Sequence, residues 1–414
     1  MSNDNLLTNL AALISIPSIL GKPKPDAPFG ESNKRALDLV LKLGRSLGFS
    51  SFNGNGYYGY IDWKGNFREN EVIGILGHLD VVPADEYKLI QKDGMLHGRG
   101  VVDNKGPVLC VLEAMSLLKQ SGYAPKHTIR LIVGCNEEKG SKCIAKYKTD
   151  NKIIPKASFT PDSAFPIVIS EMGILHLKAS LQIKGLSKHK IAINGGESVN
   201  VVPDKCCVVI DGVAHTFKGK SAHAMCPQNG ENAIYKAVSS AGTKLSDLAL
   251  VLSSLPSALR LKDDSGEQTI SLGIIKTTDD TVEMTFDLRC PVSQDIAGLK
   301  TKVQTAFAMI DPAVKITTVH FAPALSIDPD DIVVRSLLDA YTSATGMPSG
   351  HIKTGGGTYA RALPNTIAFG PAFPDQITNI HEPNEQISLD NLFKLIDIYS
   401  MAIKNLDNNL MSHP

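Results

Sequence analysis

Two short, largely apolar runs constrain the fold of this chain more than any other feature of its sequence. Residues 71–79 (EVIGILGHL) and 127–134 (HTIRLIVG) both have the composition of a strand that is buried on both faces. Residues 5–20, 33–48 and 106–122 carry apolar side chains at helical spacing. Strands and helices that alternate in this way form right-handed crossovers. The sequence therefore predicts an α/β fold around a central, mostly parallel sheet.

A second domain is expected within this fold, because 414 residues are too many for one compact core. Between about residues 173 and 318 the sequence changes to shorter, alternating strand patterns, with helical stretches at 231–255 and 293–310. This texture is typical of an α+β domain. Because helix and strand alternate again afterwards, we predict one domain made of residues 1–172 and 319–414. A second domain, residues 173–318, is inserted into it.

Composition narrows the range of partners and compartments. The 42 lysines and arginines balance the 42 aspartates and glutamates, so no net charge favours nucleic acid or an anionic membrane. The chain has no apolar stretch long enough for a spanning helix, and its acidic amino terminus does not resemble a signal peptide. It has seven cysteines, an odd number, and no two of them are spaced as C-x-x-C. We therefore expect a cytoplasmic protein that binds neither nucleic acid nor membrane.

Acidic and imidazole side chains stand at the ends of several apolar runs. They are His78 and Asp80 in GHLD, Asp103 in VVDNKG, Glu137 and Glu138 in GCNEEKG, Asp162 in FTPDSAFP, and His381 in NIHEPNE. If His78 binds a metal, Asp80 is placed to take its second ring proton, since residues i and i+2 of a strand share a face. Two adjacent carboxylates after a buried strand are costly unless a cation compensates them. Taken singly, Asp103 could instead cap a helix, and the others could stand in ordinary turns.

Together these side chains form a set that suits divalent metals. Two histidines and three carboxylates offer nitrogen and oxygen ligands without a thiolate, which favours zinc, cobalt or manganese. A pair of ions about 3.5–4 Å apart needs a shared carboxylate and further ligands on each side. The sequence contains enough ligands for such a pair.

The order of these motifs resembles a known family. GHLDVVPA, HGRGVVDNKGP, NEEKGS, FTPDSAFP and IHEPNE follow one another as in the di-zinc aminoacylase/carboxypeptidase/dipeptidase metallopeptidases. The segments FTPDSAFPIVISEMG, GGESVNVVPD, GKSAHAMCPQNGENA and GGGTYARALPNTIAFGP are similar to those of bacterial PepV-like dipeptidases and carnosinases. The resemblance covers nearly the whole chain and implies an aminopeptidase-like catalytic domain with an inserted lid.

The resemblance also implies a role for each residue of the metal site. His78, Asp103 and Asp162 would hold one ion, and Glu138, Asp103 and His381 the other, with Asp103 bridging. Asp80 would orient His78. Glu137 would be the general base that takes a proton from a metal-bridging water and delivers it to the leaving amine. Zinc is the expected metal, with manganese and cobalt as alternatives.

Further residues are implied to contact substrate. In GKSAHA, His223 matches a lid histidine that stabilises the oxyanion, and Asn200 and Arg289 match lid positions that touch substrate. The glycine-rich turn contains Gly355, Gly356 and Arg361, and its N–H groups could receive a free carboxylate. Each has a simpler interpretation: a histidine in a turn, a surface ion pair for the arginine, and a plain tight turn for the glycines.

The predicted activity is hydrolysis of unblocked dipeptides, including alanine-containing and β-alanyl ones. Deacylation of N-acyl amino acids or of succinyl-diaminopimelate is the alternative, and a non-catalytic binding relative is a remote one. Two features depart from the family pattern. Residues 85–94 are short where the family has a longer tryptophan-containing loop, and the lid is intermediate in length. The second departure leaves both a monomer and a homodimer open.

Overall fold

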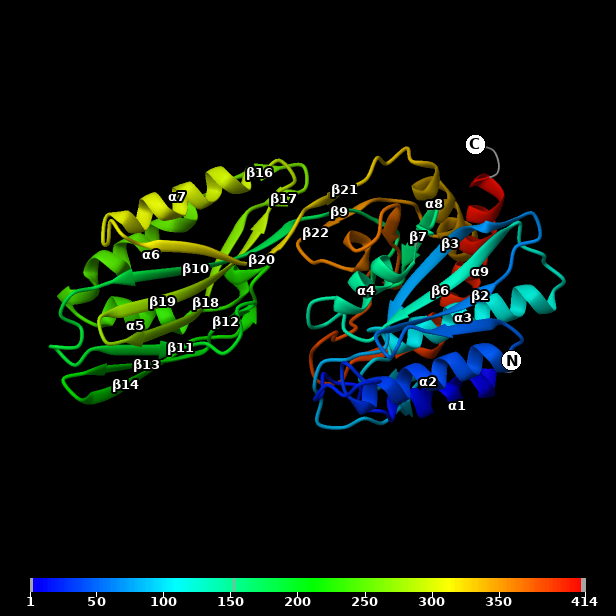
Figure 1. The fold of residues 1–414 in the computed structure, drawn as a ribbon, viewed down its shortest axis with the longest axis horizontal. Helices are drawn as coiled ribbons and strands as arrows, with labels where there is room; N and C mark the ends of the chain where they lie inside the picture. The colour runs from blue at the N-terminus through cyan, green and yellow to red at the C-terminus, as the bar shows by residue number, and fades with distance from the viewer. Residues whose placement is uncertain (1–2, 152, 411–414) are drawn as a thin grey trace. The chain divides into compact units, whose positions relative to one another are not determined.

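The computed structural model describes residues 3–151 and 153–410 (Figure 1). They form two compact units. The first runs to Ile169 and continues in Ile327–Ile352 and from Thr358 onward, and the second consists of Ser170–Ser326 and Lys353–Gly357. The short segment Lys353–Gly357 thus belongs to the second unit, although the sequence pattern put it in the catalytic domain.

A mixed sheet forms the centre of the first unit. Its order is β1–β2–β6–β3–β7–β23–β9, continued by β21, whose two residues belong to the second unit, and β22 also pairs with β9. The strands are β1 (Ser50–Asn53), β2 (Tyr58–Trp63), β3 (Arg68–His78), β6 (His127–Gly134), β7 (Ala157–Thr160), β9 (Val168–Glu171), β21 (Leu325–Ser326), β22 (Ile352–Thr354) and β23 (Thr366–Ala368). Strands β6, β3, β7 and β23 run parallel, whereas β1, β2 and β9 are antiparallel to their neighbours. The predicted α/β class with a parallel centre is confirmed.

Helices cover both faces of this sheet. They are α1 (Asn3–Ile14), α2 (Glu31–Ser46), α3 (Lys105–Gln120), α4 (Lys142–Asp150), α8 (Ile332–Thr345) and α9 (Leu389–Asn409), with the short η3 (Tyr359–Arg361). A Cβ atom on Gly59 of β2 would touch Leu37 and Leu41 of α2, whereas the ring of Tyr58 packs edge-on against Tyr147 of α4. Because successive residues of a strand point to opposite faces, α2 and α4 lie on opposite sides of the sheet.

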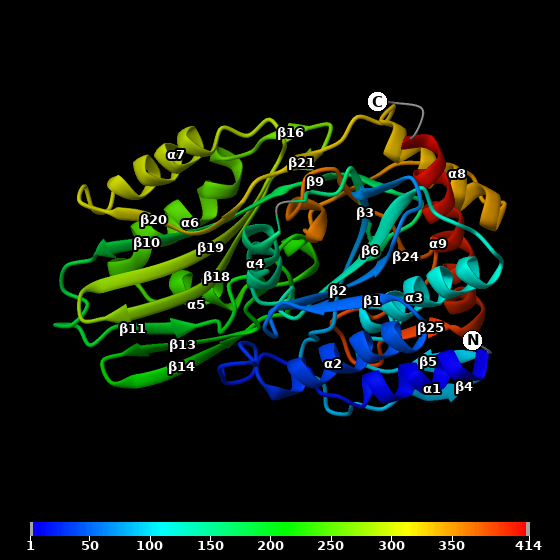
Figure 2. The ribbon, with the colours of Figure 1, turned by 45° about the vertical axis from the view of Figure 1, so that its right-hand side comes forward.

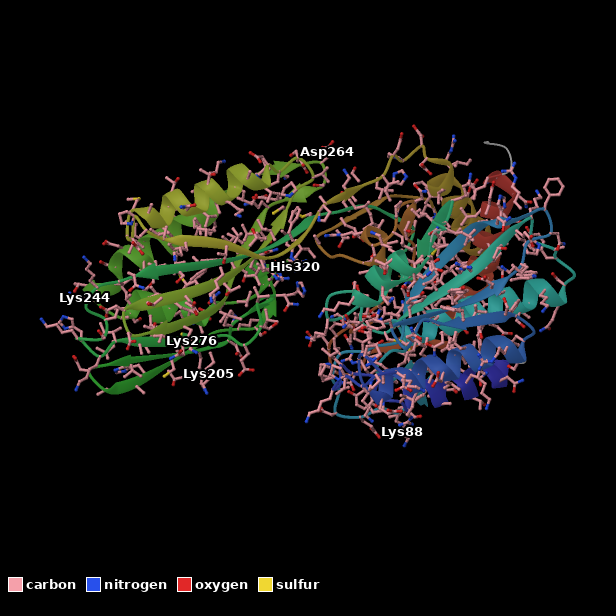
Figure 3. The ribbon with its side chains drawn as sticks, viewed as in Figure 1. Lys88, Lys205, Lys244, Asp264, Lys276 and His320 are labelled. Carbon is pink, nitrogen blue, oxygen red and sulfur yellow. The ribbon has the colours of Figure 1, made fainter. Side chains whose placement is uncertain are left out.

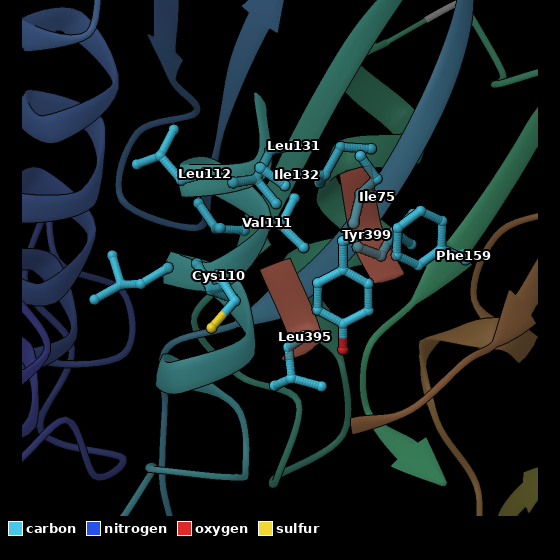
Figure 4. Packing of buried hydrophobic residues seen from close by; sticks show 14 of the residues in the cluster. Ile75, Cys110, Val111, Leu112, Leu131, Ile132, Phe159, Leu395 and Tyr399 are labelled. Atoms are coloured by element: carbon cyan, nitrogen blue, oxygen red, sulfur yellow. The ribbon is translucent and has the colours of Figure 1, made fainter. Parts of the chain in front are cut away.

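The main core lies between the sheet and helices α3 and α9 (Figure 4). Ile75 of β3 is in register with Leu131 of β6 and Phe159 of β7, so these three side chains point to the same face. There Phe159 stacks on Tyr399 of α9, with ring centroids 5.6 Å apart. Burying a side chain of this size stabilises the fold by roughly 1.5–3 kcal/mol. The two short apolar runs are therefore β3 and β6, and their composition reflects burial on both faces.

Shorter strands bring distant loops of the first unit together. They are β4 (Ile90–Lys92), β5 (Met95–His97), β8 (Ser163–Ala164), β24 (Pro371–Ala372) and β25 (Gln386–Ser388). β5 pairs with β25 (Figure 2), and in this pairing His97 lies opposite Gln386. This pairing places the loop after β5 beside the loop before β25.

An antiparallel sheet forms the second unit, in the order β14–β13–β11–β18–β19–β10–β20. Its strands are β10 (Gly173–Gln182), β11 (Ala192–Gly195), β13 (Lys205–Ile210), β14 (Val213–Lys218), β18 (Thr269–Thr278), β19 (Thr281–Cys290) and β20 (Lys315–Ala322). Alternate residues of β10, from Leu175 to Leu181, are buried in a separate apolar core, and the residues between them are half-buried. Lys205, Lys276 and His320 mark three strands of this sheet in Figure 3.

Helices of the second unit complete its α+β character. They are α5 (Ala233–Ser240), α6 (Ser246–Ala258) and α7 (Ile296–Ala308), with the short η1 (Pro227–Asn229) and η2 (Thr243–Leu245) and the two-residue strands β12 (Val201–Val202), β15 (Ala222–His223), β16 (Lys262–Asp263) and β17 (Gly266–Glu267). The stretch 231–255, predicted as one helical segment, is divided between α5 and α6. Gly242 separates them with a φ of 81°, a left-handed conformation that glycine adopts readily.

Two further features are the state of the cysteines and the length and polarity of the helices. All seven cysteines are free thiols, and most are buried, as expected for small apolar side chains. Within residues 3–151 and 153–410, each helix is too short or too polar to cross a bilayer.

Candidate active site

The candidate ligands gather at one edge of the first unit's sheet. His78 is the last residue of β3, Glu138 follows β6, and Asp162 follows β7. These three strands are parallel neighbours, so their carboxyl ends meet at the same edge. Asp103 comes from the loop before α3, and His381 from the loop before β25. The fold therefore brings together five residues from five separate segments.

Asp103 lies between two histidines. His78 Nε2 is 2.8 Å from Asp103 Oδ1 and 3.4 Å from Asp162 Oδ1. His381 Nε2 is 2.8 Å from the other oxygen, Asp103 Oδ2, and 3.0 Å from Glu138 Oε1. Within each of these two groups the potential ligand atoms lie within 4.8 Å of one another. Asp103 belongs to both groups, and each of its oxygens faces a different histidine.

The arrangement of these atoms fits a pair of divalent cations. His78 Nε2 and Asp103 Oδ1 are both buried, yet neither makes a hydrogen bond within the described residues, although they are 2.8 Å apart. Atoms that point at a common centre instead of at each other behave in this way. Two ligands about 2.1 Å from one tetrahedral ion would be ~3.4 Å apart, which is the upper end of the 2.8–3.4 Å separations here. The donors are nitrogen and oxygen only, as zinc, manganese or cobalt would accept.

Electrostatics favours cations in the same place. Burial raises the pKa of Asp162 to about 7, and the charge of Asp103 adds to this effect. Burial and the charge of Asp103 also raise the pKa of Glu138. Burial, together with the charge of Asp162, raises the pKa of Glu137 well above its usual range. Carboxylates so close together in a buried site repel one another, and positive charge among them would relieve that repulsion.

Asp80 organises the site in a different way from the one that the sequence suggested. His78 Nδ1 lies 2.9 Å from the backbone carbonyl oxygen of Asp80, whereas the nearer carboxylate oxygen is 3.6 Å away. The carboxylate instead accepts hydrogen bonds from the backbone N–H groups of Glu137 (3.0 Å) and Glu138 (3.1 Å). The His78 ring is therefore oriented by the Asp80 carbonyl, and the carboxylate anchors the turn that carries both glutamates.

Two of the predicted lid residues lie side by side in the second unit. β12 pairs with β15, with Val201 opposite His223, and the Ala224 N–H donates to the Asn200 carbonyl. His223 is exposed, and its Nδ1 accepts a hydrogen bond of 3.0 Å from the Met225 N–H. Because Nδ1 is an acceptor, the neutral imidazole carries its proton on Nε2 and can donate from there.

Arg289 and the glycine-rich turn meet elsewhere in the same unit. The guanidinium of Arg289 is buried and grips both carboxylate oxygens of Asp287, through Nε at 2.7 Å and Nη2 at 2.9 Å. Its Nη1 donates to the Gly355 carbonyl at 2.9 Å. Neither Gly355 nor Gly356 has a left-handed φ, so the backbone of this turn does not require glycine. Arg361, at the end of η3, belongs to the first unit.

Comparison with known proteins identifies the family. Residues 74–405 match peptidase family M20/M25/M40. The chain belongs to this family. A Bacillus subtilis (strain 168) protein named "Putative dipeptidase YtjP" is 28% identical to this M20 peptidase, in an alignment of 461 positions that covers 97% of each chain.

Solved structures share the fold of this M20 peptidase. Human carnosine dipeptidase 1 superposes with a TM-score of 0.65 at 14% identity, covering 98% of this chain and 96% of the other. The Bacillus subtilis YxeP protein, described as a dinuclear metal binding peptidase from the M20 family, superposes with a TM-score of 0.61 at 12% identity, covering 97% and 98%. The protein is therefore a hydrolase with the two-part fold of its family.

Sequence reasoning missed three polar residues that hold the site of this M20 peptidase together. They are Arg99, Asn104 and Glu385. Asn104 Oδ1 accepts from the His78 backbone N–H, and its Nδ2 donates to the Pro161 carbonyl, so it joins the ends of β3 and β7. The available signal was position alone, since all three stand within a few residues of a candidate ligand in the motifs GRGVVDN and HEPNE.

A cavity of about 390 Å³ opens beside the site in the first unit of this M20 peptidase. Its lining includes His381, Arg99, residues 83–86 and Lys88, which is labelled in Figure 3. The short segment 85–94 noted in the sequence therefore contributes to the surroundings of His381.

Proposed function

We propose that this M20 peptidase is a dipeptidase that hydrolyses unblocked dipeptides with the help of two divalent metal ions. The observation that carries the proposal is the position of Asp103, whose Oδ1 and Oδ2 each lie 2.8 Å from a different histidine. A carboxylate shared in this way is what a bridged pair of metal ions requires.

The residues of the two groups around Asp103 are the proposed ligands. His78, Asp103 and Asp162 would hold one ion, and Asp103, Glu138 and His381 the other. When bound, the two ions would lower the pKa of the attacking water and stabilise negative charge on the scissile carbonyl oxygen. Zinc is the proposed metal, and manganese and cobalt fit the same donors.

Glu137 is the proposed general base. It belongs to neither ligand group within the described residues, although it follows the same strand as Glu138. Its backbone is held by the Asp80 carboxylate, so its side chain starts from a fixed position. A carboxylate whose pKa is raised by burial is suited to accept a proton from water and return it to the leaving amine.

The second unit supplies the proposed contacts to substrate. His223 would donate from Nε2 to the developing oxyanion, since its Nδ1 is already an acceptor. The three hydrogen bonds of Arg289 to Asp287 and Gly355 use three of its five N–H donors, which leaves one on each Nη for a substrate carboxylate. We assign Gly355, Gly356, Arg361 and Asn200 to the same substrate-binding role.

A dipeptide is a substrate class that fits these groups. One end of a dipeptide carries the free carboxylate that Arg289 is suited to bind, and the scissile bond lies one residue away. The proposal agrees with the names of YtjP and of carnosine dipeptidase 1, which describe dipeptidases.

The proposal is tested by substrate competition on the purified protein. The chain, stripped with a chelator and reconstituted with Zn²⁺, Mn²⁺ or Co²⁺, is assayed on Ala-Ala, β-Ala-His, N-acetylalanine and N-succinyl-diaminopimelate. We expect turnover of one or both dipeptides, none in the stripped protein, and a kcat/KM at least 10-fold lower for the two acylated substrates. A preference for an acylated substrate would contradict the dipeptidase assignment, and undiminished activity after stripping would contradict the metal site.

A further inference from the structure

The carboxylate of Glu385 accepts four hydrogen bonds. Its Oε1 accepts from the backbone N–H groups of Val102 (2.8 Å) and Asp103 (3.0 Å). Its Oε2 accepts from the Gly100 N–H (2.9 Å) and from Arg99 Nη1 (2.7 Å). The side chain is only 1% exposed. Four donors satisfy both oxygens, so Glu385 is occupied with holding the chain and stands outside both groups of candidate ligands.

Arg99 extends the same contact to the other loop. Its Nη2 donates to the carbonyl oxygen of Glu382 at 3.1 Å, while Nη1 binds the Glu385 carboxylate. The Arg99 side chain is 6% exposed, so the ion pair is buried. The backbone adds one more bond, from the Gly98 N–H to the Glu385 carbonyl at 3.0 Å. Residues 98–103 and 382–385 are thereby joined by side chains and backbone together.

Each of the two joined loops carries one candidate ligand. Asp103 ends the first loop, and His381 stands directly before the second. His381 has a φ of 64°, a left-handed conformation that is strained for a residue with a Cβ atom. Such a conformation persists only where its surroundings hold it. The contact between His381 Nε2 and Asp103 Oδ2 therefore depends on how the two loops are fixed to one another.

We propose that Arg99 and Glu385 form a positioning pair that sets the spacing between the bridging carboxylate of Asp103 and the imidazole of His381. Neither residue belongs to a candidate ligand group, so the pair would act through the backbone of the two loops. The inference rests on the proposed two-metal function and adds two residues to it. Outer groups that orient metal ligands typically change affinity 10- to 100-fold when they are removed.

The substitution Glu385→Gln tests the carboxylate with little change in shape. An amide has only one acceptor oxygen, so its NH₂ group would face two of the four donors, and the buried Arg99 would lose its counter-charge. The chelator-stripped variant is titrated with CoCl₂, and uptake is followed by the visible absorption of bound Co²⁺. We expect two Co²⁺ per wild-type chain, and in the variant a roughly 10- to 100-fold higher Kd for at least one ion, with an altered absorption spectrum.

Asp62→Asn is the matched control. Asp62 and Arg130 form a buried bidentate ion pair in the same unit, with bonds of 2.7 Å and 2.8 Å, and none of these atoms bonds to the two joined loops. This variant is expected to melt earlier than the wild type but to bind Co²⁺ with a Kd within about twofold of it. If Asp62→Asn is destabilised but keeps its metal affinity, a loss of affinity in Glu385→Gln cannot be explained by lower stability of the unit.

Arg99→Lys provides a second, milder variant in case Glu385→Gln does not fold. Lysine keeps a positive charge beside Glu385 but lacks the second nitrogen that also reaches Glu382. A several-fold higher Kd for one ion is therefore expected in this variant and not in Asp62→Asn. Equal Co²⁺ affinities in wild type, Arg99→Lys and Asp62→Asn would overturn the positioning role. A wild-type chain that takes up fewer than two Co²⁺ would instead overturn the proposed function on which it rests.

Discussion

His78 and Asp80 of the first unit are held in a different way from His223 and Asn200 of the second. In the first unit, His78 is fully buried and Asp80 is 4% exposed, and each is fixed by hydrogen bonds to other parts of the site. In the second unit, His223 and Asn200 are exposed and stand on or beside two-residue strands. Burial strengthens electrostatic interactions and suits a cluster that must hold charge in place. Exposed groups on short strands suit contacts that form only when substrate arrives.

The same contrast applies to stability. The apolar core of the first unit and that of the second have no residue in common. The first surrounds a mixed sheet whose central strands are parallel and buried on both faces, whereas the second packs helices against an antiparallel sheet. A change in one core can therefore be made without touching the other, and this allows the roles of the two units to be separated by experiment.

The largest effect is expected from Glu137→Ala in the first unit. Loss of the general base should lower kcat by about 10²- to 10⁴-fold, while two Co²⁺ still bind, because Glu137 is not in either ligand group. Glu138→Ala is the matched variant, since it should lose one of the two ions. Steady-state kinetics and metal content distinguish them. Loss of metal from Glu137→Ala with retention in Glu138→Ala would reverse the two assignments.

Phe286→Ala should affect the second unit alone. Phe286 is buried in the core of that unit, and its truncation should lower the free energy of unfolding by about 3–5 kcal/mol. Co²⁺ affinity should stay within about twofold of wild type. Phe159→Ala, in the first core on the strand that precedes Asp162, should lower both stability and metal affinity. Equal metal affinities in the two variants, measured by the same titration, would remove the proposed difference between the units.

His223→Ala should separate catalysis from folding in the second unit. Removal of an oxyanion donor should lower kcat by roughly 10²- to 10³-fold with little change in KM. Since His223 is exposed, the free energy of unfolding should change by no more than about 0.5 kcal/mol. Kinetics and urea denaturation of the same preparation test both statements. An unchanged kcat would exclude His223 from the site.

The smallest effect is expected from the buried carboxylate of the second unit. Burial would raise the pKa of Asp287, but hydrogen bonds from His176 and Arg289 outweigh it, and the pKa of Asp287 is lowered. A lowered pKa stabilises the folded state above the unfolded value, about 3.9, and this stabilisation is lost as the pH falls through the folded value.

Asp287→Asn should therefore be less stable than wild type by about 1–3 kcal/mol at pH 7, and the difference should shrink below about pH 4. Urea denaturation at pH 7 and pH 3 provides the comparison. A difference that is the same at both pH values would show that the ionised form of Asp287 contributes nothing.

Much of the fold could be predicted from the sequence, because the burial of a strand is reflected in the residue types of that strand. A strand covered on both faces must be apolar throughout, and this is why residues 71–79 and 127–134 pointed to a parallel sheet. The residue types of the candidate site could also be read directly, since nitrogen and oxygen ligands without thiolates restrict the chemistry. The break at Gly242 was missed because a single glycine within a helical pattern is often tolerated.

Tertiary structure alone decided which atoms meet. The sequence placed Asp80 beside His78, but the folded chain uses the Asp80 carbonyl for the ring and its carboxylate for the turn after β6. The sequence likewise gave no indication of a role for Glu385, whereas the structure surrounds its carboxylate with four donors. Hydrogen bonds between distant segments depend on how two backbones approach each other, and no local pattern records that approach. Residue types and buried strands were determined by the sequence itself, and the partners of each polar atom were determined by the fold.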